Sequence, residues 1–461
     1  MVKFLLILLL PYCLHAQDYA DKLKQFVQGQ HDYFRFNGNV LVAKNGKVVY
    51  KDALGYADFN TGRLLDDNTV FELASVTKQF TAMAIMILKD RGALQLDDKV
   101  QKYLPSIPYD NITIRQLLSH TSGLPEYEAQ FEKNWDQNKI AFNKDVITML
   151  QQRKDSLLFK PGSKWQYSNT GYAMLASIIE KVSGMTYNDF LAKEVFKPLG
   201  MTHTYVYNTR RSTGKIPPNY ALGFLYSDSL KRYILPDSLP RARMVYYLDG
   251  IVGDGTVNST TGDLLVWDRA LASGKLISPA SINEMLSPIT QVSPRDTTGF
   301  YGYGLFILTK PNGKVITHTG GWPGYTTFLE RRTGKDETVI ILSNNETTTG
   351  QFRAGIESIL DGENILMPYK HTAVVIDPAL LDKYEGKYNA FLTLTFIKKD
   401  NKLYRYREGT PDIELKPESN TKFFYGDGTD RQIEFETDTS GKVTRAWFIN
   451  TGQRGEMKRL E

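Results

Sequence analysis

The chain has 461 residues, of which 41% are hydrophobic and 23% are charged, the composition of an ordinary globular protein. Its net charge of +5 is spread along the sequence without a long basic run, and this pattern gives no support for nucleic-acid binding. Two or three domains are expected at this length.

The first residues are typical of a secretory signal peptide. Lys3 precedes an apolar run over residues 4–10, which is too short to span a membrane, and Ala16 is a small residue suited to cleavage. Cys13 does not follow a small residue, as lipid attachment in bacterial lipoproteins would require, and cleavage after Ala16 removes this single cysteine. We therefore expect a signal peptide over residues 1–16, export to the periplasm or the outside of the cell, and no stable membrane span.

The next elements in chain order are a helix, a hairpin and two further helices. A leading amphipathic helix is expected over about residues 20–35, and two β-rich runs within residues 38–50 flank an Asn-Gly pair, which is a strong hairpin signal. Residues 72–88 become almost entirely apolar and contain neither Pro nor Gly, which predicts a helix buried on most sides. Residues 113–118 predict another helix.

Strands return late in this region. Residues 313–320, 325–330 and 337–343 form three short β runs separated by turn residues, which predicts an antiparallel meander. A helix is expected over about residues 352–360. An early hairpin, a helical middle and a late meander together predict one α+β domain whose antiparallel sheet joins both ends of its chain.

The pattern changes after about residue 372, where apolar and polar side chains alternate without a helical period. Four such runs are present, over residues 391–396, 402–406, 431–435 and 443–448. Turn residues separate them at short intervals, which predicts a small all-β, barrel-like module. We therefore expect a main domain over residues 17–370 and a β domain over residues 371–461.

The most informative motif is Ser75-Val-Thr-Lys78. Positions three apart on a helix share a face, so the hydroxyl and the amine are expected to meet. A serine becomes a good nucleophile when a base takes its proton, and a lysine in an apolar pocket can act as that base because desolvation lowers its pKa. A serine near the start of a helix can also be only a capping residue. The catalytic interpretation therefore depends on two further motifs nearer the C-terminus.

A second motif surrounds Tyr167 and Asn169. These residues are two apart, so both side chains can face the same way in an extended segment or a turn. Tyr167 can take the proton of Ser75 and pass it to a leaving group, and Asn169 can hold a substrate amide and the lysine amine. Taken alone, these residue types are also typical of a surface turn that is anchored by an aromatic side chain.

A third motif is His318-Thr319-Gly320-Gly321 at the end of a predicted strand. Glycines at a strand end let the backbone approach a ligand closely. The backbone N–H groups of Gly321 and Ser75 are expected to form a two-donor oxyanion hole. His318 and Thr319 are expected to face the substrate.

In this order, the three motifs resemble those of the serine β-lactamase and penicillin-binding protein superfamily, in particular its class C β-lactamase, D-aminopeptidase and esterase branch. The resemblance covers about residues 20–365, and the β module resembles the lipocalin-like modules of some members. It implies an antiparallel sheet with helices on both sides and a helical subdomain. It also implies that Ser75 is the acylated nucleophile, that Lys78 and Tyr167 handle protons, and that Asn169 is a positioning residue.

One residue departs from the pattern of class C β-lactamases, which resemble this chain but have Lys where it has His318. A histidine with an ordinary pKa is only about a quarter protonated at pH 7, so carboxylate recognition is expected to weaken. This favours a peptidase acting on D-amino-acid peptides, or an esterase. A true β-lactamase or DD-carboxypeptidase remains an alternative, as does a non-catalytic protein that binds β-lactams or peptidoglycan fragments.

The histidines at positions 31, 203 and 371 have no acidic neighbours at metal-ligand spacing, so neither a metal nor another cofactor is expected. The expected partner is a small molecule or a short peptide as substrate. The sequence leaves the oligomeric state open.

Overall fold

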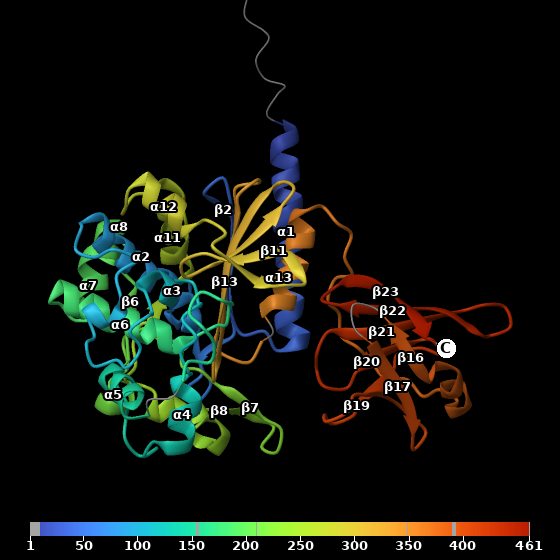
Figure 1. Cartoon of the computed structure of the whole chain (residues 1–461). Helices are drawn as coiled ribbons and strands as arrows, with labels where there is room; N and C mark the ends of the chain where they lie inside the picture. Colours follow the sequence, from blue (N-terminus) through green and yellow to red (C-terminus); the bar gives the residue numbers. More distant parts are fainter. Residues whose placement is uncertain (1–9, 154–155, 209, 348, 390–392, 461) are drawn as a thin grey trace, which may run out of the picture. The chain divides into compact units, whose positions relative to one another are not determined.

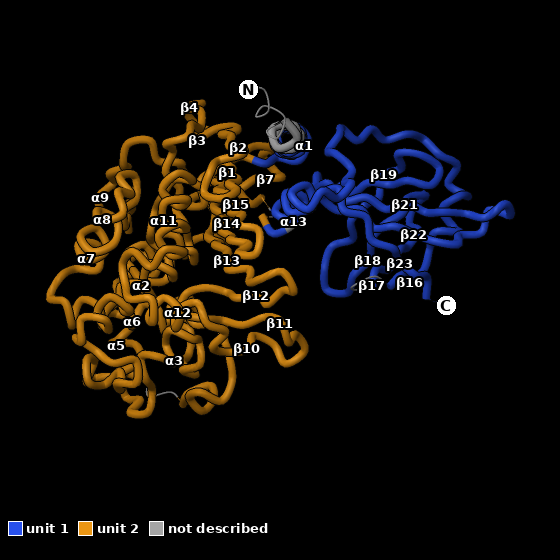
Figure 2. The backbone as a smooth tube through the Cα atoms, turned by 90° about the horizontal axis from the view of Figure 1, so that it is seen from above, with its two compact units in different colours: residues 1–36, 350–461 blue, residues 37–349 orange. Residues whose placement is uncertain are grey.

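The computed structural model describes residues 10–153, 156–208, 210–347, 349–389 and 393–460 (Figure 1). The chain forms two compact units (Figure 2): unit 1 contains residues 1–36 and 350–461, and unit 2 contains residues 37–349. Residues 1–9 of the predicted signal peptide lie outside the described residues, and the predicted boundaries at residues 16 and 370 stay predictions.

Unit 2 is built on an eight-stranded antiparallel sheet with the spatial order β10-β11-β12-β13-β14-β15-β1-β2. Its strands are β1 (Gly38–Lys44), β2 (Lys47–Leu54), β10 (Thr290–Ser293), β11 (Asp296–Tyr301), β12 (Phe306–Lys310), β13 (Gly313–Trp322), β14 (Tyr325–Arg332) and β15 (Glu337–Ser343). Because β1 pairs with β15, with Val40 opposite Ile341, the sheet joins the two ends of this unit. The predicted fold class is confirmed.

The predicted hairpin is β1–β2. Asn45 and Gly46 both have a positive φ, of 51° and 71°, which is the backbone conformation that a two-residue hairpin turn of this kind requires. The predicted meander is β13–β14–β15, in which β13 extends two residues further than expected, to Trp322. The turn after it is formed by residues 323 and 324 rather than by residues 321–324.

Short strands and helices complete unit 2. The short strands are β3 (Tyr56–Asp58), β4 (Arg63–Leu64), β5 (Phe71–Glu72), β6 (Tyr205–Val206), β7 (Leu225–Ser227), β8 (Arg232–Ile234) and β9 (Val257–Ser259). The helices are η1 (Ala74–Thr77), α2 (Lys78–Asp90), η2 (Val100–Lys102), α3 (Ile114–Leu118), α4 (Tyr127–Asn134), α5 (Asn143–Arg153), α6 (Asn169–Ser183), α7 (Tyr187–Leu191), η3 (Ala192–Phe196), α8 (Lys197–Leu199), α9 (Arg210–Thr213), η4 (Pro236–Ser238), η5 (Pro240–Ala242), α10 (Met244–Tyr247), α11 (Thr261–Ser273) and α12 (Pro279–Met285).

Helix α2 lies at the centre of the core of unit 2. Every residue from Lys78 to Leu88 is buried, which explains why the sequence is apolar on all sides of this helix. It packs against α6 and α12, and η1 in front of it contacts β13 and β14. The catalytic candidates on η1 and α2 are therefore held between the sheet and the helical part of unit 2 (Figure 1).

Unit 1 combines helices with a closed barrel. Helix α1 (Leu10–Phe34) packs on α13 (Thr349–Leu360), where the rings of Phe26 and Phe352 stack with centroids 5.6 Å apart. The short helix η6 (Pro378–Tyr384) precedes the barrel strands β16 (Gly386–Asn389), β17 (Thr393–Lys399), β18 (Lys402–Tyr406), β19 (Ile413–Pro417), β20 (Lys422–Tyr425), β21 (Arg431–Thr437), β22 (Val443–Asn450) and β23 (Gln453–Leu460). Residues 391 and 392 of the first predicted strand lie outside the described residues.

The interior of the barrel is filled by side chains. Tyr384, Tyr388 and Phe435 are buried there, and the rings of Tyr384 and Phe435 stack with centroids 4.2 Å apart. Four of the eight strands carry no strong sequence pattern. In β23, for example, only Met457 is buried and most of the other side chains are charged, so alternation is hard to recognise there. Among the described residues, no helix is long and apolar enough to cross a membrane.

Candidate active site

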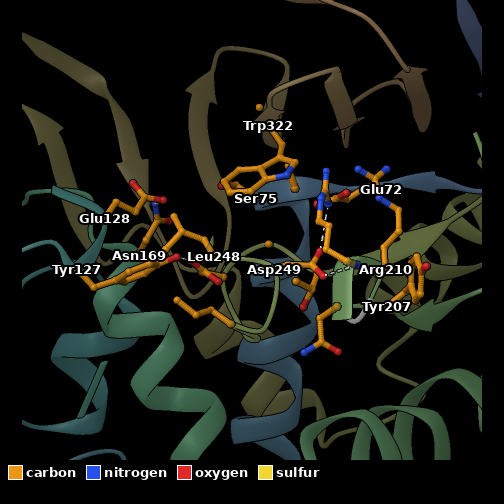
Figure 3. A pocket seen from close by; sticks show the side chains of 18 of the residues that line it. Glu72, Ser75, Tyr127, Glu128, Asn169, Tyr207, Arg210, Leu248, Asp249 and Trp322 are labelled. Carbon is orange, nitrogen blue, oxygen red and sulfur yellow. Dashed lines mark hydrogen bonds and ion pairs between the residues drawn. The ribbon is translucent and has the colours of Figure 1, made fainter. Parts of the chain in front are cut away.

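A cleft in unit 2 contains three of the predicted site residues in its wall: Ser75, Asn169 and Gly321. Figure 3 shows Tyr127, Glu128 and Asn169 on one side of Ser75, and Glu72, Tyr207 and Arg210 on the other side. Trp322, at the end of β13, also lines this cleft. The cleft therefore extends in two directions from the predicted nucleophile.

Ser75 lies on η1, one turn before α2, rather than on the α-helix itself. The residue before it, Ala74, has a φ of 47°, a left-handed conformation that is unfavourable for a residue with a side chain. The preceding Leu73 is held in place because its N–H donates to the carbonyl of Val257 at 2.9 Å and its own carbonyl accepts from Thr327 Oγ1 at 2.7 Å. These bonds to two strands maintain the unusual backbone next to Ser75.

Gly320 allows β13 to pass close to this turn. A Cβ atom at position 320 would lie 2.2 Å from the carbonyl oxygen of Leu73, which is backbone and cannot move aside. From the sequence, the glycines of this motif are expected to allow close approach to a ligand. The structure shows that Gly320 serves close approach to the protein's own backbone, whereas a Cβ at Gly321 would meet nothing within 4 Å.

Lys78 is fully buried and its ammonium has three acceptors. Nζ donates to Ser75 Oγ at 3.2 Å, to Asn169 Oδ1 at 2.7 Å and to the carbonyl of Asp254 at 2.8 Å. The structure thus brings together the serine and the lysine that the sequence places three residues apart. The two other acceptors fix the direction of the lysine side chain.

Tyr167 lies beside this lysine. The ring centre of Tyr167 is 4.9 Å from Lys78 Nζ, and the ring centre of the buried His120 lies 4.3 Å from that of Tyr167. Nδ1 of His120 accepts from the backbone N–H of Ser168 at 3.0 Å. His120 therefore holds the segment that carries Tyr167 and Asn169, which is a positioning role that the sequence analysis did not assign.

Asn169 is the first residue of α6, so Tyr167 and Asn169 stand at the entrance of a helix. Its Nδ2 donates to Glu128 Oε1 at 3.0 Å, and its backbone N–H donates to Glu126 Oε2 at 2.8 Å. Neither glutamate is among the site residues predicted from the sequence. The sequence signal is two acids at alternate positions, Glu126 and Glu128, in the segment that follows Ser122-Gly123 and enters α4.

Glu128 lines the cleft and has a perturbed carboxyl group. Burial, with the nearby charges of Asp254 and Glu126, raises the pKa of Glu128 to about 7, although Lys78 acts in the opposite direction. Asp254 in turn accepts a hydrogen bond from the hydroxyl of Tyr127 at 2.6 Å. This side of the cleft therefore offers hydrogen-bond acceptors to a ligand.

His318 is placed differently from the expectation that it faces the substrate. It is 1% exposed and is not among the residues that line the cleft. Its Nδ1–H donates to the carbonyl of Thr319 at 2.6 Å, which leaves Nε2 to accept from the hydroxyl of Tyr301 at 3.1 Å. Burial and the charge of Lys78 lower the pKa of His318 to about 3. It is therefore neutral at pH 7, and not a quarter protonated as its ordinary pKa predicts.

The other residues of this motif alternate along β13. Thr319 and Gly321 are exposed, whereas His318 and Gly320 are buried. This is the period of two that a strand imposes. Gly321 reaches the cleft together with Ser75, as an oxyanion hole made from their N–H groups requires. Within the described residues, no group of three or more His, Cys, Asp or Glu residues could hold a metal ion.

Comparison with known proteins shows the family of this chain. A model of the beta-lactamase family matches residues 23–363. The chain belongs to the beta-lactamase family. The members of this family are serine hydrolases, and penicillin-binding proteins are among the relatives of this chain.

One such relative is penicillin-binding protein 4* of Bacillus subtilis strain 168, which is 42% identical over 399 residues, 85% of this chain and 88% of the relative. Among solved structures, an octameric penicillin-binding protein homologue from Pyrococcus abyssi has a TM-score of 0.66 at 25% identity, covering 95% of this chain and 99% of its own. D-amino acid amidase from Ochrobactrum anthropi SV3 has a TM-score of 0.62 at 21% identity, covering 75% of this chain and 99% of its own. This last likeness shows the fold alone.

Proposed function

We propose that this protein hydrolyses amide or ester substrates through an acyl-enzyme formed on Ser75. The observation that carries the proposal is the 3.2 Å hydrogen bond between Lys78 Nζ and Ser75 Oγ, in a buried setting where the lysine has two further acceptors. A nucleophile and a base within hydrogen-bond reach, with the base oriented by a third group, is the arrangement that nucleophilic catalysis needs.

The reaction has two halves. Ser75 Oγ attacks the carbonyl carbon while its proton passes to the Lys78–Tyr167 pair, and the N–H groups of Ser75 and Gly321 stabilise the oxyanion. The C–N or C–O bond then breaks, and the pair returns the proton to the departing amine or alcohol. In the second half, water attacks the acyl-enzyme, gives up a proton to the pair and releases the acid, and Ser75 recovers its proton.

The side of the cleft that Glu128 lines supports a substrate without a carboxylate next to the reacting carbonyl. Glu128 lines that side of the cleft, and Asn169 has already committed its Nδ2 to it. His318 is buried and neutral, so it supplies no cation. Because the pKa of Glu128 is raised to about 7, a carboxylate near it would meet a partial like charge at neutral pH, whereas an amine or amide N–H would meet an acceptor. These features favour D-amino-acid peptides or amides, and small esters.

A second candidate is covalent reaction with β-lactams, as a β-lactamase or DD-carboxypeptidase. The observation that favours it is the 42% identity to a relative that is called a penicillin-binding protein. A substrate carboxylate remote from Glu128 would be compatible with this candidate.

Intact-protein mass spectrometry tests the proposal. The parent and Ser75→Ala are each incubated with a fluorophosphonate, with a penicillin and with D-amino-acid amides. We expect a fluorophosphonate adduct on the parent that is absent from Ser75→Ala. A penicillin adduct that persists would identify a penicillin-binding peptidase, and penicillin that is turned over would identify a β-lactamase. The absence of any adduct on the parent would overturn the proposal in favour of a non-catalytic binding protein.

We also propose that residues 1–16 are a signal peptide that is removed on export. The support is the basic residue, the apolar run and the small residue at the expected cleavage site. Expression of the full chain in a bacterial host, followed by mass spectrometry of the exported protein, is expected to show an N-terminus at Gln17. A protein that retains Met1 and stays in the cytoplasm would contradict this.

A further inference from the structure

A second cavity of unit 2 has no part in the chemistry proposed above. It lies between the large sheet and the helices α2, α11 and α12, which cover the same face of that sheet (Figure 1 and Figure 2). Its volume is about 290 Å³. Among the described residues, none lines both this cavity and the cleft that contains Ser75. The cavity is therefore a site of its own.

The walls of this cavity are mostly apolar. On the sheet, Ile316 of β13 lies opposite Arg331 of β14, and Leu329 lies two residues before Arg331 on the same face. The helices α11 and α12 supply the facing wall. The apolar side chains that line the cavity include Leu271, Ile282, Leu286, Leu305, Ile316 and Leu329. The exposed lining residues, which form its mouth, are Ala272, Asn283 and Thr333.

A buried amide group also lines this cavity. Gln79, the residue after Lys78 on α2, is only 1% exposed. Its Oε1 accepts a hydrogen bond from Trp267 Nε1 at 3.0 Å. Because an indole can only donate, this bond fixes the amide with its oxygen toward Trp267. The Nε2 group of Gln79 has no hydrogen-bond partner in the part of the chain that the structure describes.

The unpaired amide and the apolar walls together define a kind of ligand. Burying an amide N–H without an acceptor is unfavourable, so Gln79 Nε2 is stabilised by a ligand that brings an acceptor. A buried water molecule is less suited to this place, because such waters make about three hydrogen bonds and most of the lining side chains are apolar. An apolar molecule with one acceptor group fits both the walls and the amide.

The charges in the wall favour a neutral ligand. Asp268 and Arg331 line the cavity, and Arg331 Nη1 donates to Asp268 Oδ2 at 2.7 Å. Asp268 also accepts from Thr338 Oγ1 at 2.8 Å, and Asp336 accepts from both Arg331 and Arg269 at 2.5 Å. The two acids and the two arginines are thus paired with each other. An ionic ligand would lose its hydration without gaining an opposite charge that lacks a partner, and this cost is much smaller for a carbonyl group.

We propose that this cavity binds a neutral carbonyl compound, with its apolar body against the sheet, α11 and α12, and its carbonyl oxygen accepting from Gln79 Nε2. An apolar cavity of about 150 Å³ holds one benzene ring, so a cavity of about 290 Å³ admits a ligand of roughly ten to twelve non-hydrogen atoms. This inference is independent of the proposed function, because neither Ser75 nor a scissile bond takes part. The ligand would contact the helix that begins with Lys78.

Three probes of equal size test the proposal. They are 4-phenylbutan-2-one, which has a neutral carbonyl group, 3-phenylpropanoate, which has a carboxylate, and 4-phenylbutan-2-amine, which has an ammonium. Calorimetry measures the ketone on full-length Ser75→Ala, in which the ketone cannot add to the nucleophile. The affinity of each ion is taken from its ability to displace the ketone, so that binding in the cleft does not contribute. We expect one saturable site for the ketone, with an affinity at least about 10-fold higher than that of either ion.

Further variants, made in the same Ser75→Ala chain, assign the binding to the cavity. Leu271→Trp fills the cavity from α11 and Ile282→Trp fills it from α12, so each is expected to weaken ketone binding by at least about 10-fold. Leu230→Trp, at an exposed site of unit 2, is the matched control and is expected to keep the parent affinity. Thermal unfolding shows whether each variant is folded, and the second filling variant replaces the first if the first does not fold.

Gln79→Met tests the hydrogen bond itself. It removes the donor and keeps the length of the side chain, so it is expected to weaken ketone binding by about 3- to 10-fold, the range for one hydrogen bond between neutral groups. Gln95→Met, at an exposed site of unit 2, is its control and is expected to leave the affinity unchanged.

The outcomes concern the cavity alone. Failure of the ketone to bind, displacement of the ketone by either ion with equal affinity, or ketone binding that is unchanged in a folded filling variant would each overturn the site. An affinity that is the same in folded Gln79→Met would overturn the role of the amide. Hydrolysis by the parent protein is measured separately, so a failure of this inference is distinguishable from a failure of the proposed function.

Discussion

Lys78 and Asn169 are joined by a 2.7 Å hydrogen bond between the lysine ammonium and the asparagine Oδ1. The residues are 91 positions apart in the chain, and the bond connects the helix after the nucleophile to the start of α6. Since Nδ2 of the same amide donates to Glu128, Asn169 has a fixed orientation, with its oxygen toward the lysine and its nitrogen toward the acid. The asparagine therefore orients the lysine amine that also contacts Ser75 Oγ.

Replacing Asn169 tests this alignment. In Asn169→Ala, Lys78 loses an acceptor and Glu128 loses its donor, so we expect acylation of Ser75 by a fluorophosphonate to slow by about 100-fold, the cost of misplacing a catalytic group. The rate is followed by quenched-flow mass spectrometry over pH 6–9, where a changed pH profile identifies an effect on the base. Asn134→Ala, at an exposed site in α4, is the control. An unchanged rate would show that Asn169 is not needed.

The glycines of β13 are expected to differ in their effect on stability. Gly320→Ala places a Cβ 2.2 Å from the carbonyl oxygen of Leu73, so we expect the free energy of unfolding to fall by about 1–3 kcal/mol. Gly321→Ala meets nothing within 4 Å, and its free energy of unfolding is expected to stay within about 0.5 kcal/mol of the parent. Chemical denaturation measures both. Equal losses would contradict the close approach of β13 to the nucleophile turn.

Acidification is expected to destabilise the protein partly through His318. The pKa of His318 is about 3 in the folded chain, against an ordinary value of 6.5, so below pH 6.5 the unfolded chain binds a proton that the folded chain does not. Stability is therefore present above pH 6.5 and is lost as the pH falls toward 3. His318→Gln removes this contribution, and its Tm is expected to fall less than that of the parent between pH 7.5 and pH 4.5. An equal fall in Tm for the variant and the parent would contradict the burial of His318 and indicate that its ring is exposed to solvent.

Glu128 is expected to make the folded chain less stable as the pH rises, which is the opposite of the effect of His318. Its pKa is about 7 in the folded chain, against an ordinary value of 4.5, so between these values the folded chain holds the extra proton, and stability falls as the pH rises from 4.5 to 7. Glu128→Gln abolishes the cost of the buried charge. Its Tm relative to the parent is expected to be higher at pH 8 than at pH 4.5. Glu132→Gln, at an exposed site in the same helix, is expected to show no such difference.

Much of the fold could be predicted from local patterns. The Asn-Gly hairpin, the three-stranded meander and the buried helix after Ser75 are local because a turn or a hydrophobic run needs only its own residues to be recognised. The sequence predicts a barrel-like module but not strands such as β19 and β23. Pro417 in β19 and the charged residues of β23 obscure the alternation of apolar and polar side chains. These strands form because they pair with neighbouring strands when the barrel closes, and this pairing has no local sequence pattern.

The sequence by itself determined the nucleophile candidate and its lysine, because residues three apart in a helical segment meet whatever the rest of the chain does. It also determined the order of the motifs, and with it the family. Only the tertiary structure decided what surrounds them: that Glu128 holds Asn169, that His318 is buried against Tyr301, and that Glu72 and Arg210 share one arm of the cleft. These relationships join segments far apart in the chain, and burial and charge at each of them depend on packing that no local pattern contains.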